Sequence, residues 1–291
     1  MIVITAPTGR IGHQVLESLT GGTEAIRVIA RAPDRLSAQI RDRVEVVQGS
    51  HNDPAVLTKA FTGADAVLWL VPPNPSADDP MEHYLGFTRP ACEAATAQGV
   101  QRIVGVSSLG ADYGEDAGLL TPAFAMDDLI ERTGVAYRSL RMPFFMENLL
   151  AQAETIKNQG TFFLANAADR PLRLVATQDI ATTATRLLLD DTWTGQDSVP
   201  VLSPDALTPT QMARTISEAL GKPVTFQQVG MADYKADMLR YGMSDAWAQG
   251  LADMARAQNN GIYEAEAASA TPSPTTFLHW CQDVLAPAVQ N

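Results

Sequence analysis

The clearest indication of the fold comes from residues 2–12, which read Ile2-Val3-Ile4-Thr5-Ala6-Pro7-Thr8-Gly9-Arg10-Ile11-Gly12. This stretch joins a β-branched run to residues 12–19, whose apolar side chains recur with helical spacing. A dinucleotide-binding fold places its glycine-rich turn between such a strand and helix, because the free N–H groups and the dipole of the helix start favour a diphosphate. A side chain at Gly9 would block that approach, and Gly12 lets the helix pack closely on the strand. We therefore predict a pyrophosphate loop over Thr5–Gly12.

Short β-branched runs then alternate with helical patterns as far as about residue 150, which is typical of βαβ units and a parallel sheet. The predicted fold class is α/β, with a doubly wound parallel Rossmann sheet in the order 3-2-1-4-5-6 or an extension of it. The remaining strands of this sheet are expected at 25–30, 44–47, 66–71, 102–106 and 136–140, and helices at 84–98 and 124–132.

Beyond residue 150 the alternation loosens, and a smaller C-terminal α+β substrate lobe is predicted. We assign residues 1–150 to an NADP-binding Rossmann domain and residues 151–291 to a discontinuous substrate-binding lobe, with residues 172–189 returning to the first domain. Strands are expected here at 172–175, 198–202 and 224–229, and helices at 208–220, 231–258 and 275–285.

The end of the second predicted strand indicates which nicotinamide nucleotide is bound. A site that prefers NAD usually has a carboxylate here for the ribose hydroxyls, but this strand ends Ile29-Ala30-Arg31. A guanidinium pairs well with a phosphate dianion through charge-assisted hydrogen bonds. We therefore predict NADP(H) in preference to NAD(H), the alternative being that Arg31 is a solvated surface residue.

Composition narrows the range of partners. The 291 residues carry a formal net charge of -12, so nucleic acid and anionic membrane surfaces are not expected as partners. No apolar run reaches the ~18 residues of a membrane span, and the first strand begins directly after Met1, which leaves no room for a signal peptide. Cys92 and Cys281 are interpreted as free thiols in a reducing cytosol, so a cytoplasmic location is predicted. A homodimer is left open.

Five segments resemble one family: TAPTGRIG (5–12), VIARAPDRL (28–36), QGSHNDPAVLTKAFTGADAV (48–67), GVQRIVGVSSLGAD (99–112) and GVAYRSLRMPFFMENLL (134–150). Together they resemble the NmrA-like branch of the atypical short-chain dehydrogenases/reductases, over nearly the whole chain. Within that family the functional analogues we would name are NADPH-dependent quinone reductases and triphenylmethane dye reductases.

The resemblance implies roles for individual residues. The pyrophosphate would be held by Thr8, Gly9, Arg10, Ile11 and Gly12, with Thr5 at the start of the loop, and the 2′-phosphate by Arg31 with Arg35. Ser50 and His51 would lie near the adenine, and Leu70, Val71 and Pro72 beside the ribose. Ser107 and Pro143 would lie near the nicotinamide, and the substrate pocket would include Ser108, Phe144, Phe145, Met146 and Glu147.

Two positions depart from the family pattern. Ala6 replaces the first glycine of the loop, and Pro7 removes one backbone N–H and biases Ala6 toward an extended conformation. Ser50 replaces an aspartate, which puts its adenine contact in doubt.

The chemistry is constrained by what is missing from the sequence. None of the six tyrosines has a lysine four residues later, so the usual tyrosine acid of a carbonyl reductase is absent and the catalytic residues are unknown. Tyr113 is a weak candidate acid. Asp127 and Asp128 are alternative candidate acids, but they are interpreted more simply as solvated helix residues. The four histidines are scattered, so no metal site is predicted.

Two hypotheses follow. In the first, the protein is an NADP(H)-dependent reductase that transfers hydride to a quinone-like, conjugated or cationic acceptor, a small hydrophobic or aromatic molecule that needs no strong protein acid. Met231, Met238, Met243 and Met254 would join the phenylalanines in an adaptable apolar pocket, although plain core packing is the simpler interpretation of most of them. In the second, it is a non-catalytic NADP(H)-sensing regulatory protein that binds a protein partner.

Overall fold

The computed structural model describes residues 1–290 and contains a seven-stranded parallel sheet in the order β10-β6-β5-β4-β1-β2-β3. This confirms the predicted fold class, and the predicted strand order is extended at one edge by β10. The strands are β1 (Ile2–Ile4), β2 (Ile26–Ala30), β3 (Glu45–Gln48), β4 (Ala66–Trp69), β5 (Arg102–Ser108), β6 (Ala136–Met142) and β10 (Gln196–Pro200).

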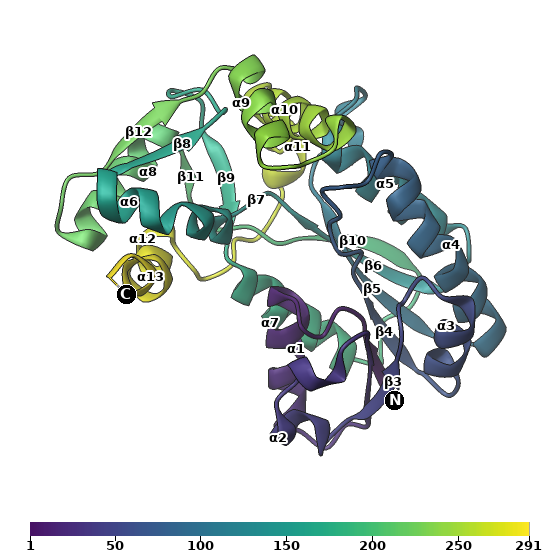
Figure 1. Cartoon of the computed structure of the whole chain (residues 1–291). Helices are drawn as coiled ribbons and strands as arrows, with labels where there is room; N and C mark the ends of the chain where they lie inside the picture. The colour runs from purple at the N-terminus through teal and green to yellow at the C-terminus, as the bar shows by residue number, and fades with distance from the viewer. Residues whose placement is uncertain (291) are drawn as a thin grey trace.

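Helices cover both faces of this sheet (Figure 1). One face packs against α3 (Pro54–Phe61), α4 (Pro80–Gln98) and α5 (Thr121–Glu131). The other packs against α1 (Arg10–Thr20), α2 (Ala38–Arg41) and α7 (Thr177–Leu189). Because both faces are buried, the central strands β1 and β4 are apolar on both sides rather than alternating.

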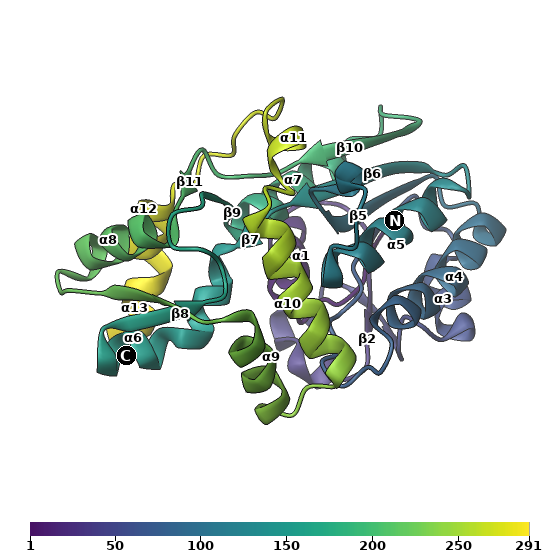
Figure 2. The ribbon, with the colours of Figure 1, turned by 90° about the horizontal axis from the view of Figure 1, so that it is seen from above.

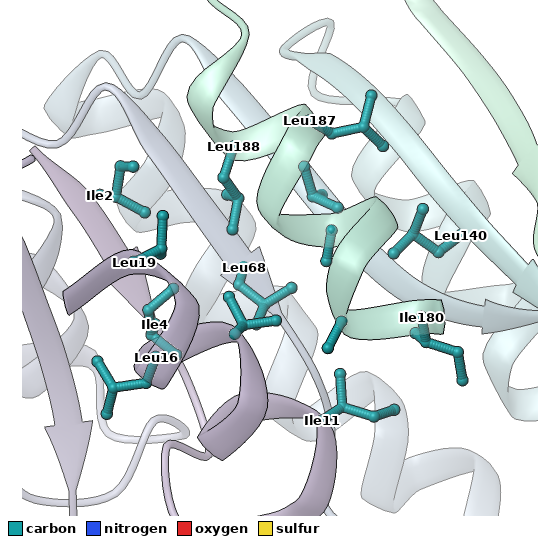
Figure 3. Close-up of a cluster of buried hydrophobic side chains, with 14 of the residues drawn as sticks. Ile2, Ile4, Ile11, Leu16, Leu19, Leu68, Leu140, Ile180, Leu187 and Leu188 are labelled. Atoms are coloured by element: carbon teal, nitrogen blue, oxygen red, sulfur yellow. The ribbon is translucent and has the colours of Figure 1, made fainter. Parts of the chain in front are cut away.

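Two helices from distant parts of the sequence pack side by side on the second face. Figure 3 shows Ile11, Leu16 and Leu19 of α1 beside Ile180, Leu187 and Leu188 of α7, all directed toward apolar side chains of the sheet. In each helix the buried residues recur at three- and four-residue spacing, which places them on one stripe. This packing fixes the first turns of both helices at the carboxyl edge of the sheet.

A smaller lobe is built around two short sheets, ordered β11-β9-β7 and β12-β8. Its core includes the fully buried Phe162, Phe277 and Trp280. Its strands are β7 (Phe144–Phe145), β8 (Thr161–Leu164), β9 (Leu172–Val175), β11 (Ala206–Leu207) and β12 (Thr225–Gln228). Its helices are α6 (Ala153–Gln159), α8 (Pro209–Leu220), α9 (Met231–Arg240), α10 (Asp245–Asn259), α11 (Glu264–Ala267), α12 (Phe277–Trp280) and α13 (Ala286–Gln290).

The chain passes between the two parts several times. After β9 it returns to the large sheet, where α7 packs on α1 and β10 pairs with β6, before it forms the rest of the lobe. Figure 2 shows α10 lying across the molecule between the lobe and the helices of the large domain. Among residues 1–290, none of the helices combines the length and the apolar character that crossing a membrane requires.

The single helix predicted over 231–258 is wrong. The structure has two helices there, α9 and α10, separated by Gly242 at φ +83°. A left-handed glycine ends a helix readily because it lacks a Cβ, and the side chain of Ser244 then caps α10 by accepting from the Trp247 amide. The apolar periodicity continued through the break and concealed it.

Candidate functional site

The amino end of α1 is open to an anion. Gly9 occupies the N-cap position, no side chain caps the helix, and its first turn contains no acidic residue. Within residues 1–290, the amides of Arg10, Ile11 and Gly12 have no acceptor, as expected for the first turn of an uncapped helix. Thr8, Gly9 and Arg10 are exposed. The predicted loop therefore presents free backbone donors at the positive end of a helix dipole.

The shape of this loop depends on close approach of its backbone. The Gly9 amide donates to the Ala6 carbonyl oxygen at 3.0 Å, and a Cβ on Gly12 would overlap that oxygen and lie 2.9 Å from the Ala6 carbonyl carbon. Ala6 itself has φ +47°, so the expectation of an extended Ala6 is wrong. The tight turn onto α1 requires a left-handed residue here and overrides the local bias that Pro7 imposes.

Thr5 supports the loop from behind. Its side chain is fully buried, and its hydroxyl donates to the Leu68 carbonyl oxygen at 2.8 Å and accepts from the Leu70 amide at 3.0 Å. These contacts commit the Thr5 side chain to the protein, and the predicted place of Thr5 at the nucleotide stays a prediction. Thr5 fixes the ends of β1 and β4 relative to each other.

Three arginines lie on the nucleotide side of the sheet edge without a carboxylate partner. Arg10, Arg31 and Arg35 are all exposed, and none of them takes part in an ion pair within the described chain. No acidic residue occupies the end of β2. Free guanidinium groups beside the open end of α1 are suited to a second phosphate group.

His51 forms part of the wall of this region rather than an open contact. The side chain is buried, its ring lies edge-on to Trp69 and Phe87, and its Nε2 lies 3.1 Å from the Leu70 carbonyl oxygen. Burial lowers the pKa of His51 to about 4, and the nearby charge of Arg31 contributes in the same direction. The ring is thus packed inside the protein, and the predicted place of His51 near the adenine stays a prediction.

The segment after β4 is held in place by these contacts. His83 Nε2 lies 2.8 Å from the Pro72 carbonyl oxygen, so histidines on either side fix the backbone of residues 70–72. Leu70 and Pro72 are half-buried and Val71 is buried. Their predicted place beside the ribose, and that of the half-buried Ser50 near the adenine, stay predictions.

A buried carboxylate marks the end of β5. Asp127 of α5 is only 3% exposed and accepts hydrogen bonds from the hydroxyls of Tyr137 at 2.6 Å, Ser107 at 2.7 Å and Ser139 at 2.7 Å. Burial raises the pKa of Asp127, and the three hydroxyl donors and Arg141 oppose that rise. The interpretation of Asp127 as a solvated residue is wrong, because its side of α5 faces the sheet, whereas Asp128 is exposed as expected.

Ser108 and two tyrosines line the opposite side of this strand end. The Ser108 hydroxyl donates to the carbonyl oxygens of Leu109 and Met142, at 3.0 and 3.2 Å. Burial raises the pKa of Tyr263 to about 12, with Gln258 and Ser108 acting against it. Tyr113 is half-buried, and its hydroxyl accepts from Asn260 at 3.2 Å, so this candidate acid connects the loop after β5 to the end of α10.

Part of the predicted substrate pocket lies in the lobe core instead. Phe144 and Met146 are buried among lobe side chains, because β7 pairs with β9 inside that lobe. Glu147 is also buried, and its Oε1 accepts from the Thr177 amide at 3.0 Å and from Trp280 Nε1 at 3.1 Å. These three side chains are thus packed within the lobe, and their predicted place in the substrate pocket stays a prediction. Pro143 is buried, Phe145 is half-buried, and Met231, Met238, Met243 and Met254 are half-buried on α9 and α10 and beside them.

A further pair of residues, Arg141 and Glu266, could not be recognised from the sequence. They lie 125 positions apart, yet Arg141 Nη1 is 3.2 Å from Glu266 Oε2. Arg141 falls within a strand and Glu266 on a four-residue helix, where no local pattern indicates a partner. The pair links the large sheet to the C-terminal part of the chain.

Comparison with known proteins agrees with this geometry. A family model described as NAD(P)H-binding matches residues 7–191, which include the open end of α1. The chain belongs to this NAD(P)H-binding family. The predicted membership of its NmrA-like branch is confirmed by this match together with the relatives that follow.

Relatives of this family member include enzymes. Quinone oxidoreductase 2 of Escherichia coli (strain K12) is 31% identical over 268 residues, which cover 91% of this chain and 90% of that protein. A crystal structure of an NADPH-dependent quinone oxidoreductase from Escherichia coli, complexed with NADPH, matches all of this chain and 99% of its own, with a TM-score of 0.80 and 28% identity.

A third likeness concerns the fold alone. The structure of NmrA, a negative transcriptional regulator in complex with NADP, covers 99% of this chain and 96% of its own, with a TM-score of 0.77 at 13% identity. The same architecture thus carries both a reductase and a regulator, so the fold does not choose between the two hypotheses.

Proposed function

We propose that this protein is an NADPH-dependent reductase of quinone-like, conjugated or cationic acceptors. The observation that carries the proposal is the open amino end of α1 beside Arg31, an exposed arginine with no carboxylate partner in the described chain. The amides of Arg10, Ile11 and Gly12 would hold the diphosphate. Arg31, with Arg35, would hold the 2′-phosphate, which distinguishes NADPH from NADH.

The bound nucleotide would supply a hydride, and the residues of this chain would position the acceptor against it. Two hydroxyls at the end of β5 are already committed: Ser107 donates to Asp127, and Ser108 donates to backbone carbonyls. Neither has a proton free for the acceptor. This arrangement favours acceptors whose reduction needs no strong protein acid, with water completing protonation, and the likeness to the quinone oxidoreductase supports the same class.

The proposal is tested by following NADPH absorbance with purified protein and a panel of benzoquinones, naphthoquinones and cationic dyes. We expect turnover with at least one acceptor class and slower turnover when NADH replaces NADPH. Tight NADPH binding without turnover across the panel would contradict the reductase and favour the sensor. Absence of binding would overturn both.

A further inference from the structure

A chain of contacts leads away from the end of β5 through charged side chains. Ser107 donates to Asp127 Oδ2 at 2.7 Å, and Arg141 Nε lies 3.9 Å from the same oxygen. Arg141 Nη1 then reaches Glu266 Oε2 at 3.2 Å. The four residues come from β5, α5, β6 and α11, so the contacts join the large domain to the C-terminal segment.

Glu266 connects this chain of contacts back to the loop that follows β5. Its other oxygen, Oε1, accepts from the amides of Gly110 at 2.7 Å and Ala111 at 3.1 Å, in the loop that follows β5. The contacts thus form a ring that leaves β5 at Ser107 and re-enters the chain three residues later. We call Ser107, Asp127, Arg141 and Glu266, with the Gly110 and Ala111 amides, the β5 ring.

The loop is held from a second side by packing. A Cβ on Gly110, which has φ +99°, would lie 2.8 Å from the Ile262 side-chain carbon Cδ1, so backbone and side chain are in close contact there. Residues 262–266 therefore both cover the loop and bind its amides. The conformation of the β5 end depends on a segment more than 150 residues further along the chain.

The β5 ring is costly as a source of stability alone. The Arg141 and Glu266 side chains are 17% and 13% exposed, and Asp127 is more deeply buried. Moving such charges out of water costs free energy that their attraction barely offsets, and apolar residues of similar volume often stabilise as well. Charged groups in a closed ring do, however, fix one orientation for every member.

Ser107 is the member whose orientation has a consequence for the site. Its proton points to Asp127, which accepts from three hydroxyls, and the positive charge of Arg141 lies close by, with Nε 3.9 Å from the same carboxylate and no hydrogen bond between them. Only the lone pairs of the Ser107 oxygen are left. A molecule that meets this oxygen must bring a hydrogen-bond donor, such as an amide N–H or a hydroxyl group.

We propose that Glu266 is a positioning residue of the reductase: through Arg141 and Asp127 it holds Ser107 as a hydrogen-bond acceptor at the carboxyl end of β5. The inference rests on the proposed function. It assigns to the C-terminal segment a part in the reaction geometry that is separate from binding of the phosphates, since Glu266 touches neither α1 nor Arg31 in the described contacts.

The test compares Glu266→Gln with Glu264→Gln. Glu264 lies on the same short helix and binds Arg173 at 2.9 Å, but has no contact with the β5 ring. We expect Glu266→Gln to lower kcat with a quinone roughly tenfold, since a misplaced group of this kind costs up to about 100-fold, while the NADPH dissociation constant changes less than about twofold. Amide hydrogen exchange at Gly110 and Ala111 should become faster. Glu264→Gln should match the wild type in all three measurements.

The outcomes separate the two proposals. A wild-type protein that reduces no acceptor overturns the proposed function, and the positioning role with it. A wild type that turns over, with a Glu266→Gln variant of equal kcat, overturns only the positioning role. A variant whose kcat falls in step with a lower melting temperature, and recovers on cooling, also overturns it, because that pattern reports stability alone.

Discussion

Two regions at the carboxyl edge of the large sheet differ in how their polar groups are bonded. We call the region of α1 and Arg31 the nucleotide end, and the region of Ser107, Ser108 and Arg141 the acceptor end. At the nucleotide end, three backbone amides and the guanidinium of Arg31 lack a partner within the described chain and face outward. At the acceptor end, Arg141 Nη1 binds Glu266, and the hydroxyls of Ser107 and Ser108 are donated to the protein itself. One end is open to a charged ligand, whereas at the other most polar side-chain groups already have partners within the protein, with Arg141 Nε as an exception.

This difference has a physical reason. Exposed amides and arginines are hydrated at little cost and can exchange water for phosphate oxygens. Buried polar groups must be paired within the protein, because an unpaired one costs ~1–3 kcal/mol or more. We therefore expect the affinity for NADPH to depend mainly on the nucleotide end, and the orientation of the acceptor to depend mainly on the acceptor end. The following predictions test whether affinity and orientation are divided between the two ends in this way.

The largest effect is expected from Gly12→Ala. The added methyl group would overlap the Ala6 carbonyl oxygen, so α1 must shift away from β1. We expect a destabilisation of ~1–3 kcal/mol from overpacking and loss of measurable NADPH binding, by denaturant unfolding and calorimetry. Gly21→Ala, at the other end of α1 with its nearest neighbour at 3.7 Å, is the matched control and should leave both unchanged. Full NADPH affinity in Gly12→Ala would show that the loop is not the binding element.

The second prediction concerns pH. Since burial lowers the pKa of His51 from 6.5 to about 4, the unfolded chain binds a proton that the folded one rejects. The neutral ring therefore contributes its full stability above pH 6.5, and that stability is lost as the pH falls toward 4. The loss approaches about 3 kcal/mol, at 1.36 kcal/mol for each pH unit.

The measurement is the free energy of unfolding between pH 7 and pH 4 for the wild type and His51→Asn, which keeps a donor but does not titrate. The variant is expected to be less stable at pH 7 and to show a shallower decline with acidification. Parallel curves would mean that His51 binds its proton equally well in the folded and unfolded states, and that the wall behind Leu70 is wetter than the structure indicates.

The third prediction concerns Arg31, the residue proposed to distinguish NADPH from NADH. Arg31→Ala should weaken NADPH binding by ~1–3 kcal/mol, the range for charge-assisted hydrogen bonds, with little change for NADH. Titration calorimetry with both nucleotides measures the two effects. Arg43→Ala, an exposed arginine that precedes β3 and therefore lies at the opposite, amino end of the strands, is the control. An equal loss for both nucleotides would remove the phosphate role of Arg31.

The smallest effect is expected at the acceptor end. Asp78 and Asp79 follow β4, and Asp112, Glu115 and Asp116 follow β5, all exposed. A quinone carrying a sulfonate should therefore have a kcat/KM several-fold lower than its uncharged parent, on the order of the steering effects of like charges, and salt should reduce the gap. A faster sulfonated substrate would indicate a free cation at this end.

The nucleotide end was largely predictable from the sequence because its determinants are contiguous. Strand, turn, glycines and helix follow one another over residues 2–20, and Arg31 comes directly after the next strand. The sequence could not show that the Thr5 hydroxyl binds the backbone of β4, or that Ala6 takes a left-handed conformation against the bias of Pro7. Both depend on contacts that only the assembled loop creates.

The acceptor end was poorly predictable because its contacts are long-range. Asp127 looked like a solvated helix residue, since nothing near it in sequence indicates that hydroxyls of β5 and β6 would surround it. Glu266 contacts residues 125 and 156 positions away. Met146 and Glu147 belong to a segment that resembles the family. Their side chains nevertheless pack into the lobe, which that resemblance does not specify.

We propose that the open end of α1 and Arg31 together bind NADPH. The decisive experiment is to titrate the purified wild-type protein with NADPH and with NADH in a calorimeter, at fixed salt. We expect saturable heat with both and a dissociation constant for NADPH at least about tenfold lower, equivalent to 1.4 kcal/mol. No heat with either nucleotide at millimolar concentration, or equal affinity for the two, would contradict it.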